Sequence, residues 1–149
     1  IIRARTFNLL GPGMPTSLFA SSVAKQIVEI ELKKKKEKLY VGNLTSKRDF
    51  IDVRDAVKAY LNIILYGKPG EAYNVCTGKS YYMSDCIKIL TGYTKNKMEI
   101  IVDNEKVKKD EVKNQIGNNM KLKELCPWDP KISLEKSLLD LINYWRKIL

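Results

Sequence analysis

The sequence predicts an α/β fold, because short runs of β-branched and aromatic residues alternate with segments whose apolar residues recur at helical spacing. Its 149 residues, 44% of them apolar, can bury roughly two thirds of the unfolded surface, so we expect a single domain over residues 1–149. The chain opens with Ile1–Phe7, an extended run that ends before Gly11–Pro12–Gly13. Such a run is typical of a central strand of a parallel sheet that leads into a loop.

A helix and a strand follow this opening. The helix is expected from about residue 17 until the lysine run 33–36 ends it, and its apolar face comprises Leu18, Val23, Ile27 and Ile30. The strand is Leu39–Val41, a β-branched and aromatic run that ends at the turn Gly42–Asn43.

The stretch from Val41 to Tyr60 organises the rest of the chain. We expect Lys47–Arg48–Asp49 in a loop, followed by Asp52 as the N-cap of a helix that carries Asp55 in its first turn. The apolar face predicted for this helix consists of Val53, Ala56, Val57, Tyr60 and Ile64. Strand, charged loop and capped helix together would hold Arg48, whose guanidinium group can bind a phosphate through two parallel hydrogen bonds. The alternative is a solvated loop with a local ion pair.

Turns separate short elements in the next part of the chain. Gly67 and Pro69–Gly70 end the second helix, and strands are expected at Ala72–Cys76 and Met98–Val102. Between these strands, Ser84 is expected to cap a short helix that stops near Gly92. Residues 103–119 are polar and weakly periodic, which predicts mostly loop.

Two helices are expected to close the chain. A short helix spans Met120–Leu125 and ends before the break at Pro127–Trp128–Asp129–Pro130. Ser133 is placed to cap the last helix. Its inward face comprises Leu134, Leu138, Leu141, Ile142 and Trp145.

Composition excludes several classes of chemistry. The sequence has no histidine, which removes Ser-His and Cys-His catalysis and disfavours a metal site. Cys76, Cys86 and Cys126 are far apart and form no Cys-x-x-Cys pair, as expected of free thiols in a reducing compartment. There is no apolar run of about 18 residues and no signal-peptide pattern, so we expect a cytoplasmic protein without membrane contact.

The net charge of +10 raises the hypothesis of a basic module that binds nucleic acid or another polyanion. Lysines cluster at 33–36 and 38, and again at 106, 108 and 109. They are not interleaved with aromatic residues, and no recognition-helix, zinc-finger or RNA-binding signature accompanies them. The composition therefore favours an exposed lysine-rich helix end over a nucleic-acid interface.

Several separated motifs resemble one enzyme family. They are VGNLTSKRDFIDVRDAVKAY at 41–60, Arg-x-Phe-Asn with Gly-Pro-Gly at 5–13, GEAYNVCTG at 70–78 and the Trp128–Asp129–Pro130 step. Together they are similar to the extended short-chain dehydrogenase/reductase family of NAD-dependent epimerases and dehydratases, and within it to the enzymes that act on GDP-sugars. The resemblance implies the C-terminal part of a Rossmann-type enzyme, with late sheet strands and the small substrate-binding lobe. The N-terminal dinucleotide-binding half would be absent from this chain.

The resemblance implies NAD(P) as the cofactor of the full-length enzyme. This chain contains neither the Gly-rich turn that would cradle the cofactor diphosphate nor a Tyr-x-x-x-Lys pair that would pass a proton. Tyr93 and Lys97 stand four apart, but they lie in a polar stretch after Gly92 rather than in a long helix. We therefore expect no catalytic residue, no bound cofactor and no activity in this chain alone.

The resemblance also implies a set of substrate-binding residues. Arg48 matches the family arginine that binds the substrate diphosphate. Val41, Gly42 and Asn43 match the strand segment beside the nucleotide base, where a glycine permits close backbone approach. Asn8 matches an asparagine placed to donate to the sugar or phosphate; the alternative role for it is closing the loop at Gly11.

Three further positions belong to this set. Gln26 matches a position on the preceding helix that can face the nucleotide, and an ordinary exposed glutamine is the alternative. Lys108 and Glu111 match a family pair in which a cation serves a phosphate and a carboxylate accepts from ribose hydroxyls. Lysine at 108 replaces the usual arginine and lacks its bidentate fork, so its grip on a phosphate should be weaker. Leu9 replaces a usual histidine, so any polar contact from that position is lost.

The resemblance leaves the reaction open among related enzymes. Gly11–Pro12–Gly13 favours a GDP-sugar reductase over a GDP-mannose dehydratase, and UDP- and dTDP-sugar epimerases and dehydratases share the same plan. The implied partners are a nucleotide-sugar, the missing N-terminal half and further copies in a homo-oligomer. Because Ile1–Phe7 would have its sheet neighbours in that half, we expect this segment to self-associate or to be disordered in the isolated chain.

Overall fold

The computed structural model describes residues 1–107 and 112–149. In chain order the elements are β1 (Arg3–Thr6), β2 (Asn8–Leu10), α1 (Phe19–Glu31), β3 (Lys38–Val41), β4 (Lys47–Asp52), α2 (Val53–Tyr66), β5 (Ala72–Val75), β6 (Ser80–Tyr82), α3 (Met83–Thr91), β7 (Glu99–Val102), the 3-10 turn Asn104–Lys106, β8 (Asn114–Gln115), α4 (Met120–Leu125) and α5 (Leu134–Ile148). The fold is α/β, as predicted. None of the helices in the described ranges is long and apolar enough to cross a bilayer.

The strands form three small sheets that run along the molecule. β1 pairs with β5 in parallel, and the chain between them forms β2, α1, β3, β4 and α2. β2 and β8 pair with β4 in parallel, and β6 pairs with it antiparallel, so β4 connects the three other strands of a four-stranded sheet. β3 pairs with β7 in parallel.

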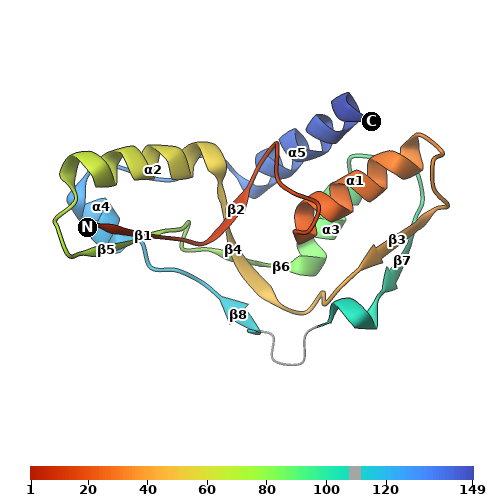
Figure 1. Ribbon diagram of the computed structural model, residues 1–149. Helices are drawn as coiled ribbons and strands as arrows, with labels where there is room; N and C mark the ends of the chain where they lie inside the picture. The colour runs from red at the N-terminus through yellow and green to blue at the C-terminus, as the bar shows by residue number, and fades with distance from the viewer. Residues whose placement is uncertain (108–111) are drawn as a thin grey trace.

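Helices gather at the two ends of these sheets (Figure 1). At one end α2 and α4 pack with β1 and β5, and at the other α1, α3 and α5 pack together beside β3 and β7. Two clusters of buried apolar residues correspond to these ends. The larger is built mainly from α1, α3 and α5, and the smaller is built around Ala59, Ile63, Tyr73 and Trp128.

The structure corrects the predicted loop at Lys47–Arg48–Asp49, which is the first half of strand β4. The charged residues at these positions are typical of a loop. In the structure, however, β4 pairs with strands on both of its sides. These partner strands lie far from β4 in the sequence, so no local pattern predicted the pairing. The Asp49 side chain is fully buried and accepts hydrogen bonds from three separate residues, so burial of its charge is compensated.

The opening strand is also shorter than predicted. Instead of one strand over Ile1–Phe7 and then a loop, β1 covers Arg3–Thr6 and β2 resumes at Asn8. The chain changes partner at Phe7: its amide still donates to Val75 O of β5, while Asn8 already pairs with Phe50 of β4. This change of sheet is a tertiary feature without a sequence signal.

Helix α2 departs from its predicted inward face. Asp52 caps it as expected, and its carboxylate accepts from the Arg54 amide at 2.8 Å. Ala56 is buried, but Val57 and Ile64, both predicted to face inward, are 56% and 75% exposed. The buried face is rotated to Asp55, Ala56, Ala59 and Ile63.

Other elements agree with the sequence within a few residues. Ser133 caps α5 and accepts from the Lys136 amide, and Leu134, Leu138, Leu141 and Ile142 are buried as predicted. On α1, Val23, Ile27 and Ile30 are buried, whereas Leu18 precedes the helix and is exposed.

Two short segments differ in detail from the prediction. Helix α3 begins at Met83, so Ser84 is not its cap; the Asp85 carboxylate accepts from the Tyr82 amide instead. The predicted loop 103–119 contains the 3-10 turn and strand β8.

Candidate functional site

A cavity of about 740 Å³ opens beside α1, β3 and β4. Its walls come from the start of α1, the end of β3, strand β4, the start of α3 and the segment around β8. Its lining residues are Thr16, Ser17, Leu18, Phe19, Ser22, Val23, Tyr40, Val41, Gly42, Asn43, Arg48, Met83, Glu105, Val112 and Gln115. Apolar side chains and hydroxyl or amide groups share the wall, the usual composition of a site for a small ligand with polar groups.

Arg48 is the arginine in the lining of this cavity. It lies in β4 beside β8, and its Nη1 donates to Val112 O at 2.6 Å and to Lys47 O at 2.8 Å. Both of these acceptors are backbone oxygens, so the fold itself helps to hold the guanidinium group in place. A cation that is already positioned loses less entropy when it binds an anion.

Asp49 is the next residue of β4, and its side chain is fully buried. Its Oδ1 accepts from the amide and the hydroxyl of Thr77, and its Oδ2 accepts from the amides of Gly78 and Gly117. A Cβ at Gly117 would overlap the Cys76 side chain, so only glycine fits this approach. The carboxylate therefore ties β4 to two turns that lie far away in the sequence.

Val41 and Asn43 lie on the opposite wall, where β3 ends. Val41 is buried, and the Oδ1 of Asn43 accepts from the amide and hydroxyl of Thr45, which shapes the turn after the strand. Gly42 lies between them and also lines the cavity. The structure therefore brings together Arg48, Val41 and Asn43, three residues that the sequence grouped.

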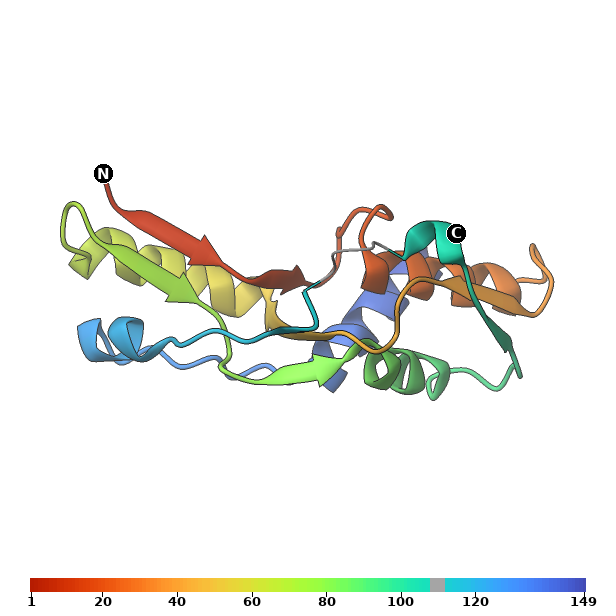
Figure 2. The ribbon, with the colours of Figure 1, turned by 90° about the horizontal axis from the view of Figure 1, so that it is seen from below.

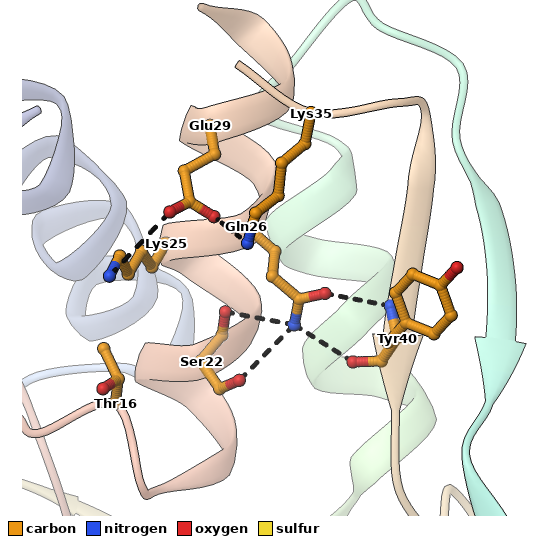
Figure 3. A pocket seen from close by; sticks show the side chains of 7 residues that line it. All are labelled: Thr16, Ser22, Lys25, Gln26, Glu29, Lys35 and Tyr40. Carbon is orange, nitrogen blue, oxygen red and sulfur yellow. Dashed lines mark hydrogen bonds and ion pairs between the residues drawn. The ribbon is translucent and has the colours of Figure 1, made fainter. Parts of the chain in front are cut away.

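Gln26 lines an adjoining smaller cavity of about 390 Å³, shown in Figure 3, and not the larger one. Its Oε1 accepts from the Tyr40 amide and its Nε2 donates to Tyr40 O, both at 3.0 Å. These bonds make Gln26 a side-chain partner for the edge of β3. Beside it, Glu29 lies between Lys25 and Lys35, at 3.8 and 2.6 Å (Figure 3).

Asn8 does not line either cavity and contacts its neighbours instead. Its Nδ2 donates to Asp49 O at 2.9 Å and to Gln115 Oε1 at 3.0 Å. Gln115 does line the larger cavity. Asn8 thus orients a cavity residue and joins β2, β4 and β8. This role differs from closure of the loop at Gly11, the alternative to the predicted contact with the sugar or phosphate.

The last two predicted site residues cannot be placed, and Tyr93, which was not predicted as a site residue, lies away from the cavity. Lys108 and Glu111 lie outside the described residues. Tyr93 follows α3, and its hydroxyl donates to Glu135 O at 3.0 Å at the larger core. Burial raises the pKa of this phenol, and Tyr93 is not among the cavity residues. Within the described ranges, no group of three or more acidic or cysteine side chains is arranged to hold a metal ion.

The three thiols are free and buried. Burial is the main cause that raises the pKa of Cys76 to about 11 and that of Cys86 to about 12. Protonated, inaccessible thiols are poor nucleophiles, so the arrangement serves packing rather than covalent chemistry.

Several cavity residues had no usable signal in the sequence. Gln115 belongs to a polar stretch, and only its pairing in β8 with β4 brings it to the site. Thr16, Ser17 and Ser22 precede or open α1, where serine and threonine are ordinary residues. Tyr40 offered a signal, because it is an aromatic residue two positions before a strand-ending glycine, and its side chain is 45% exposed in the structure.

The chain is similar to known proteins over most of its length. Residues 1–141 match the family described as GDP-mannose 4,6 dehydratase. The chain belongs to this family. Its fold is the mixed α/β fold of the C-terminal part of extended short-chain reductases, as expected from the motifs.

Two curated relatives and one solved structure illustrate the match. GDP-6-deoxy-D-mannose reductase of Pseudomonas aeruginosa is 31% identical over 145 residues, which are 97% of this chain and 48% of the relative. GDP-6-deoxy-D-talose 4-dehydrogenase of Aggregatibacter actinomycetemcomitans is 28% identical over 136 residues, 91% of this chain and 45% of the relative. The structure of RMD from Pseudomonas aeruginosa complexed with NADPH superposes with a TM-score of 0.93 at 30% identity, over 99% of this chain and 49% of that one. The chain spans about half the length of the curated relatives it matches.

Proposed function

We propose that this chain is the nucleotide-sugar-binding part of an NAD(P)-dependent GDP-sugar reductase similar to GDP-4-dehydro-6-deoxy-D-mannose reductase. One observation carries the proposal: Arg48, the residue matched to the family's diphosphate-binding arginine, lies in the wall of a cavity large enough for a nucleotide-sugar. Its guanidinium group is held by two backbone oxygens, and a phosphate binds most strongly to an arginine that is already oriented.

The other walls suit the rest of such a ligand. The backbone at Val41–Asn43 would lie beside the base, and Phe19 and Met83 supply apolar surface for a planar ring. We assign Gln115 as a polar contact for the ligand and Asn8 as the residue that orients it, which moves the direct role predicted for Asn8 to its neighbour. Gln26 supports the β3 edge, and Lys108 and Glu111 keep their proposed phosphate and ribose roles on the family match alone.

The cofactor belongs to the remainder of the enzyme in this proposal. NAD(P) supplies hydride transfer in such reductases, and the sequence of this chain has no Gly-rich turn to hold its diphosphate. Residues 1–149 would therefore form a single substrate-binding part that has no turnover alone. Incubation of the chain with NADH or NADPH and a GDP-4-dehydro-6-deoxy sugar should leave absorbance at 340 nm constant, and cofactor oxidation above the blank would contradict this division.

A second candidate within the family is the dehydratase reaction, since the matching family is named for it. Gly11–Pro12–Gly13 and the identity to the Pseudomonas reductase favour reduction. From another class, the polyanion-binding module is supported only by the net charge of +10. We also propose a cytoplasmic, homo-oligomeric full-length enzyme, which fractionation and light scattering of that enzyme would test.

The nucleotide preference distinguishes these possibilities. Calorimetric titration of the chain with GDP-mannose, UDP-glucose and a single-stranded oligonucleotide should give the tightest binding for the GDP-sugar. Equal or tighter binding of UDP-glucose would move the chain to the epimerases and dehydratases of other nucleotides. Tight binding of the oligonucleotide alone, with a steep loss of affinity on addition of salt, would support the polyanion module.

A further inference from the structure

Glu105 brings a carboxylate into the wall of the larger cavity. Among the lining residues that the structure describes, it is the one acidic side chain, and Arg48 is the one basic side chain. The sequence motifs did not group Glu105 with the other site residues. A ligand that suits both charges has to carry an anionic group for the arginine and N–H or O–H donors for the carboxylate.

The backbone at Glu105 is held beside the end of β3. Strand β7 pairs with β3 as far as Val41 and Val102, and the Asp103 amide then donates to Val41 O at 2.8 Å. The Oδ1 of Asp103 accepts from the Glu105 amide at 3.1 Å, which begins the 3-10 turn. Figures 1 and 2 both show this turn, in teal, next to the end of β3. The exposed Glu105 side chain therefore belongs to the same part of the cavity as Val41–Asn43.

The charge of Glu105 restricts which way round a nucleotide-sugar can lie. A carboxylate repels phosphate oxygens, because both groups are anionic and neither can donate a hydrogen bond. The diphosphate is therefore directed to Arg48 on β4, and the group that approaches Glu105 has to be one that donates. In a nucleotide-sugar bound in this direction, that group is the base or the ribose.

The nucleotide bases differ in what they offer to a carboxylate. Guanine presents its N1–H and its 2-amino group side by side, and these two donors match the two oxygens of one carboxylate. In uracil, thymine, cytosine and adenine, each donor on the corresponding edge lies next to an acceptor, which a carboxylate disfavours. The O6 acceptor of guanine needs a donor, and the hydroxyl groups of Thr16, Ser17 and Ser22 in the same cavity wall can supply one.

The ribose diol also offers two neighbouring donors. The position of Glu105 favours the base, because the proposed function places the base beside Val41–Asn43, and the Val41 carbonyl is bonded to the residue two before Glu105. The ribose lies between the base and the diphosphate of the ligand, so it is nearer to the Arg48 contact. A ribose contact would also serve every ribonucleotide alike, which makes the two roles separable by experiment.

We propose that Glu105 selects guanine in this cavity, its carboxylate accepting from the N1–H and the 2-amino group of the base. The inference rests on the proposed function for the location of the base, and it adds the residue that sets the base preference. Glu105 acts in specificity and takes no part in hydride or proton transfer.

Calorimetric titration of the chain with GDP, IDP and UDP tests the assignment. The base of IDP keeps the O6 and N1–H of guanine and lacks the 2-amino group. Glu105→Gln preserves the shape of the side chain but replaces one acceptor oxygen by a donor, which then faces a donor of guanine. Glu99→Gln is the matched control, because Glu99 is an exposed residue of β7 that pairs with Lys38 at 3.8 Å and does not line the cavity.

We expect Glu105→Gln to bind GDP about tenfold to hundredfold more weakly than the wild type, the usual effect of losing a charge-assisted hydrogen bond. Its affinity for UDP should be unchanged or tighter, and the preference of the wild type for GDP over IDP should largely disappear. Glu99→Gln should match the wild type with all three nucleotides.

Two results would overturn the assignment while leaving the proposed function intact. The first is a Glu105→Gln variant that binds GDP as tightly as the wild type. The second is an equal loss of affinity for GDP and UDP, which would assign Glu105 to the ribose. A wild type that binds none of the three nucleotides would instead refute the proposed function, and the selection of guanine with it.

Discussion

The two ends of the molecule differ in how completely their helices are used. On α5, charged residues face away from the core, among them Lys136, Arg146 and Lys147. On α2, Leu61 and Ile64 face away from the core instead. Helix α5 therefore has a largely polar outer face, and helix α2 has a second apolar face.

The same contrast explains why helical periodicity predicted the buried face of α5 correctly and that of α2 incorrectly. The apolar residues of α5 occupy one narrow face, and all four of the aliphatic residues predicted to be inward are buried. On α2 the apolar residues cover most of the circumference, so periodicity could not decide which part faces the core of this chain. A helix with apolar residues on opposite sides usually contacts more than one neighbour.

Equal truncations of leucine at the two ends should have very different effects. Leu138 of α5 is fully buried, and Leu138→Ala should lower the free energy of unfolding by about 2–5 kcal/mol. Leu61→Ala removes the same atoms from the exposed face of α2 and should change it by no more than about 0.5 kcal/mol. Urea unfolding at 25 °C measures both, and similar losses would mean that the α2 face is already covered in the isolated chain.

Two buried aspartates, one beside the candidate site and one in α2, allow effects on stability to be separated from effects on ligand binding. The Oδ2 of Asp55 accepts from the amides of Lys131 and Ile132, whereas Asp49 ties the turns below the cavity. Replacement of either by asparagine should cost about 1.5–3 kcal/mol, because charge-assisted hydrogen bonds are lost. Only Asp49→Asn should also weaken the binding of GDP-mannose. A similar affinity loss for Asp55→Asn would show that the effect comes from stability alone.

Asp52 connects the two ends and gives a smaller, pH-dependent effect. Its carboxylate caps α2 and accepts from the Ser137 hydroxyl of α5 at 2.5 Å. Burial acts to raise the pKa of Asp52, but hydrogen bonds from Arg54 and Ser137 outweigh it, so the folded pKa lies below the ordinary value of about 3.9. Its stabilisation is therefore present above about pH 4 and is lost as the pH falls through the folded pKa.

The variant Asp52→Asn should accordingly lower stability at pH 7 by about 0.5–2 kcal/mol, the usual range for loss of an N-cap. Its unfolding free energy should depend less on pH below about pH 4 than that of the wild type. Asp129→Asn, an exposed aspartate paired with Lys123, is a suitable control. Identical acid dependence in wild type and Asp52→Asn would contradict the assignment of the lowered pKa to this group.

Much of the fold could be predicted because its signals are local. Caps at Asp52 and Ser133, the strand before Gly42 and the last amphipathic helix are encoded within a few residues of each other. Strand β4 could not be predicted, since its four-strand environment comes from β2, β6 and β8. Only tertiary pairing makes a strand of a segment that begins Lys-Arg-Asp.

The candidate site divides in the same way. Arg48, Val41 and Asn43 could be predicted from the sequence because they lie within one recognisable stretch. Gln115 and the orienting role of Asn8 could not be predicted, because they depend on a contact between residues more than a hundred positions apart. Gln26 was placed correctly on its helix, but its amide is used by the backbone of Tyr40.

The binding of a nucleotide-sugar by Arg48 is the central claim, and one calorimetric comparison tests it most directly. GDP-mannose is titrated into the wild type, Arg48→Ala and Arg5→Ala; the last removes the same charge from exposed strand β1. Loss of a charge-assisted phosphate contact typically costs about 1.5–3 kcal/mol, which is roughly a tenfold to hundredfold change in affinity. We predict this loss for Arg48→Ala, a smaller loss for Lys108→Ala because lysine lacks the bidentate fork, and wild-type affinity for Arg5→Ala. If Arg48→Ala bound GDP-mannose as tightly as the wild type while remaining folded by circular dichroism, the diphosphate assignment would be wrong.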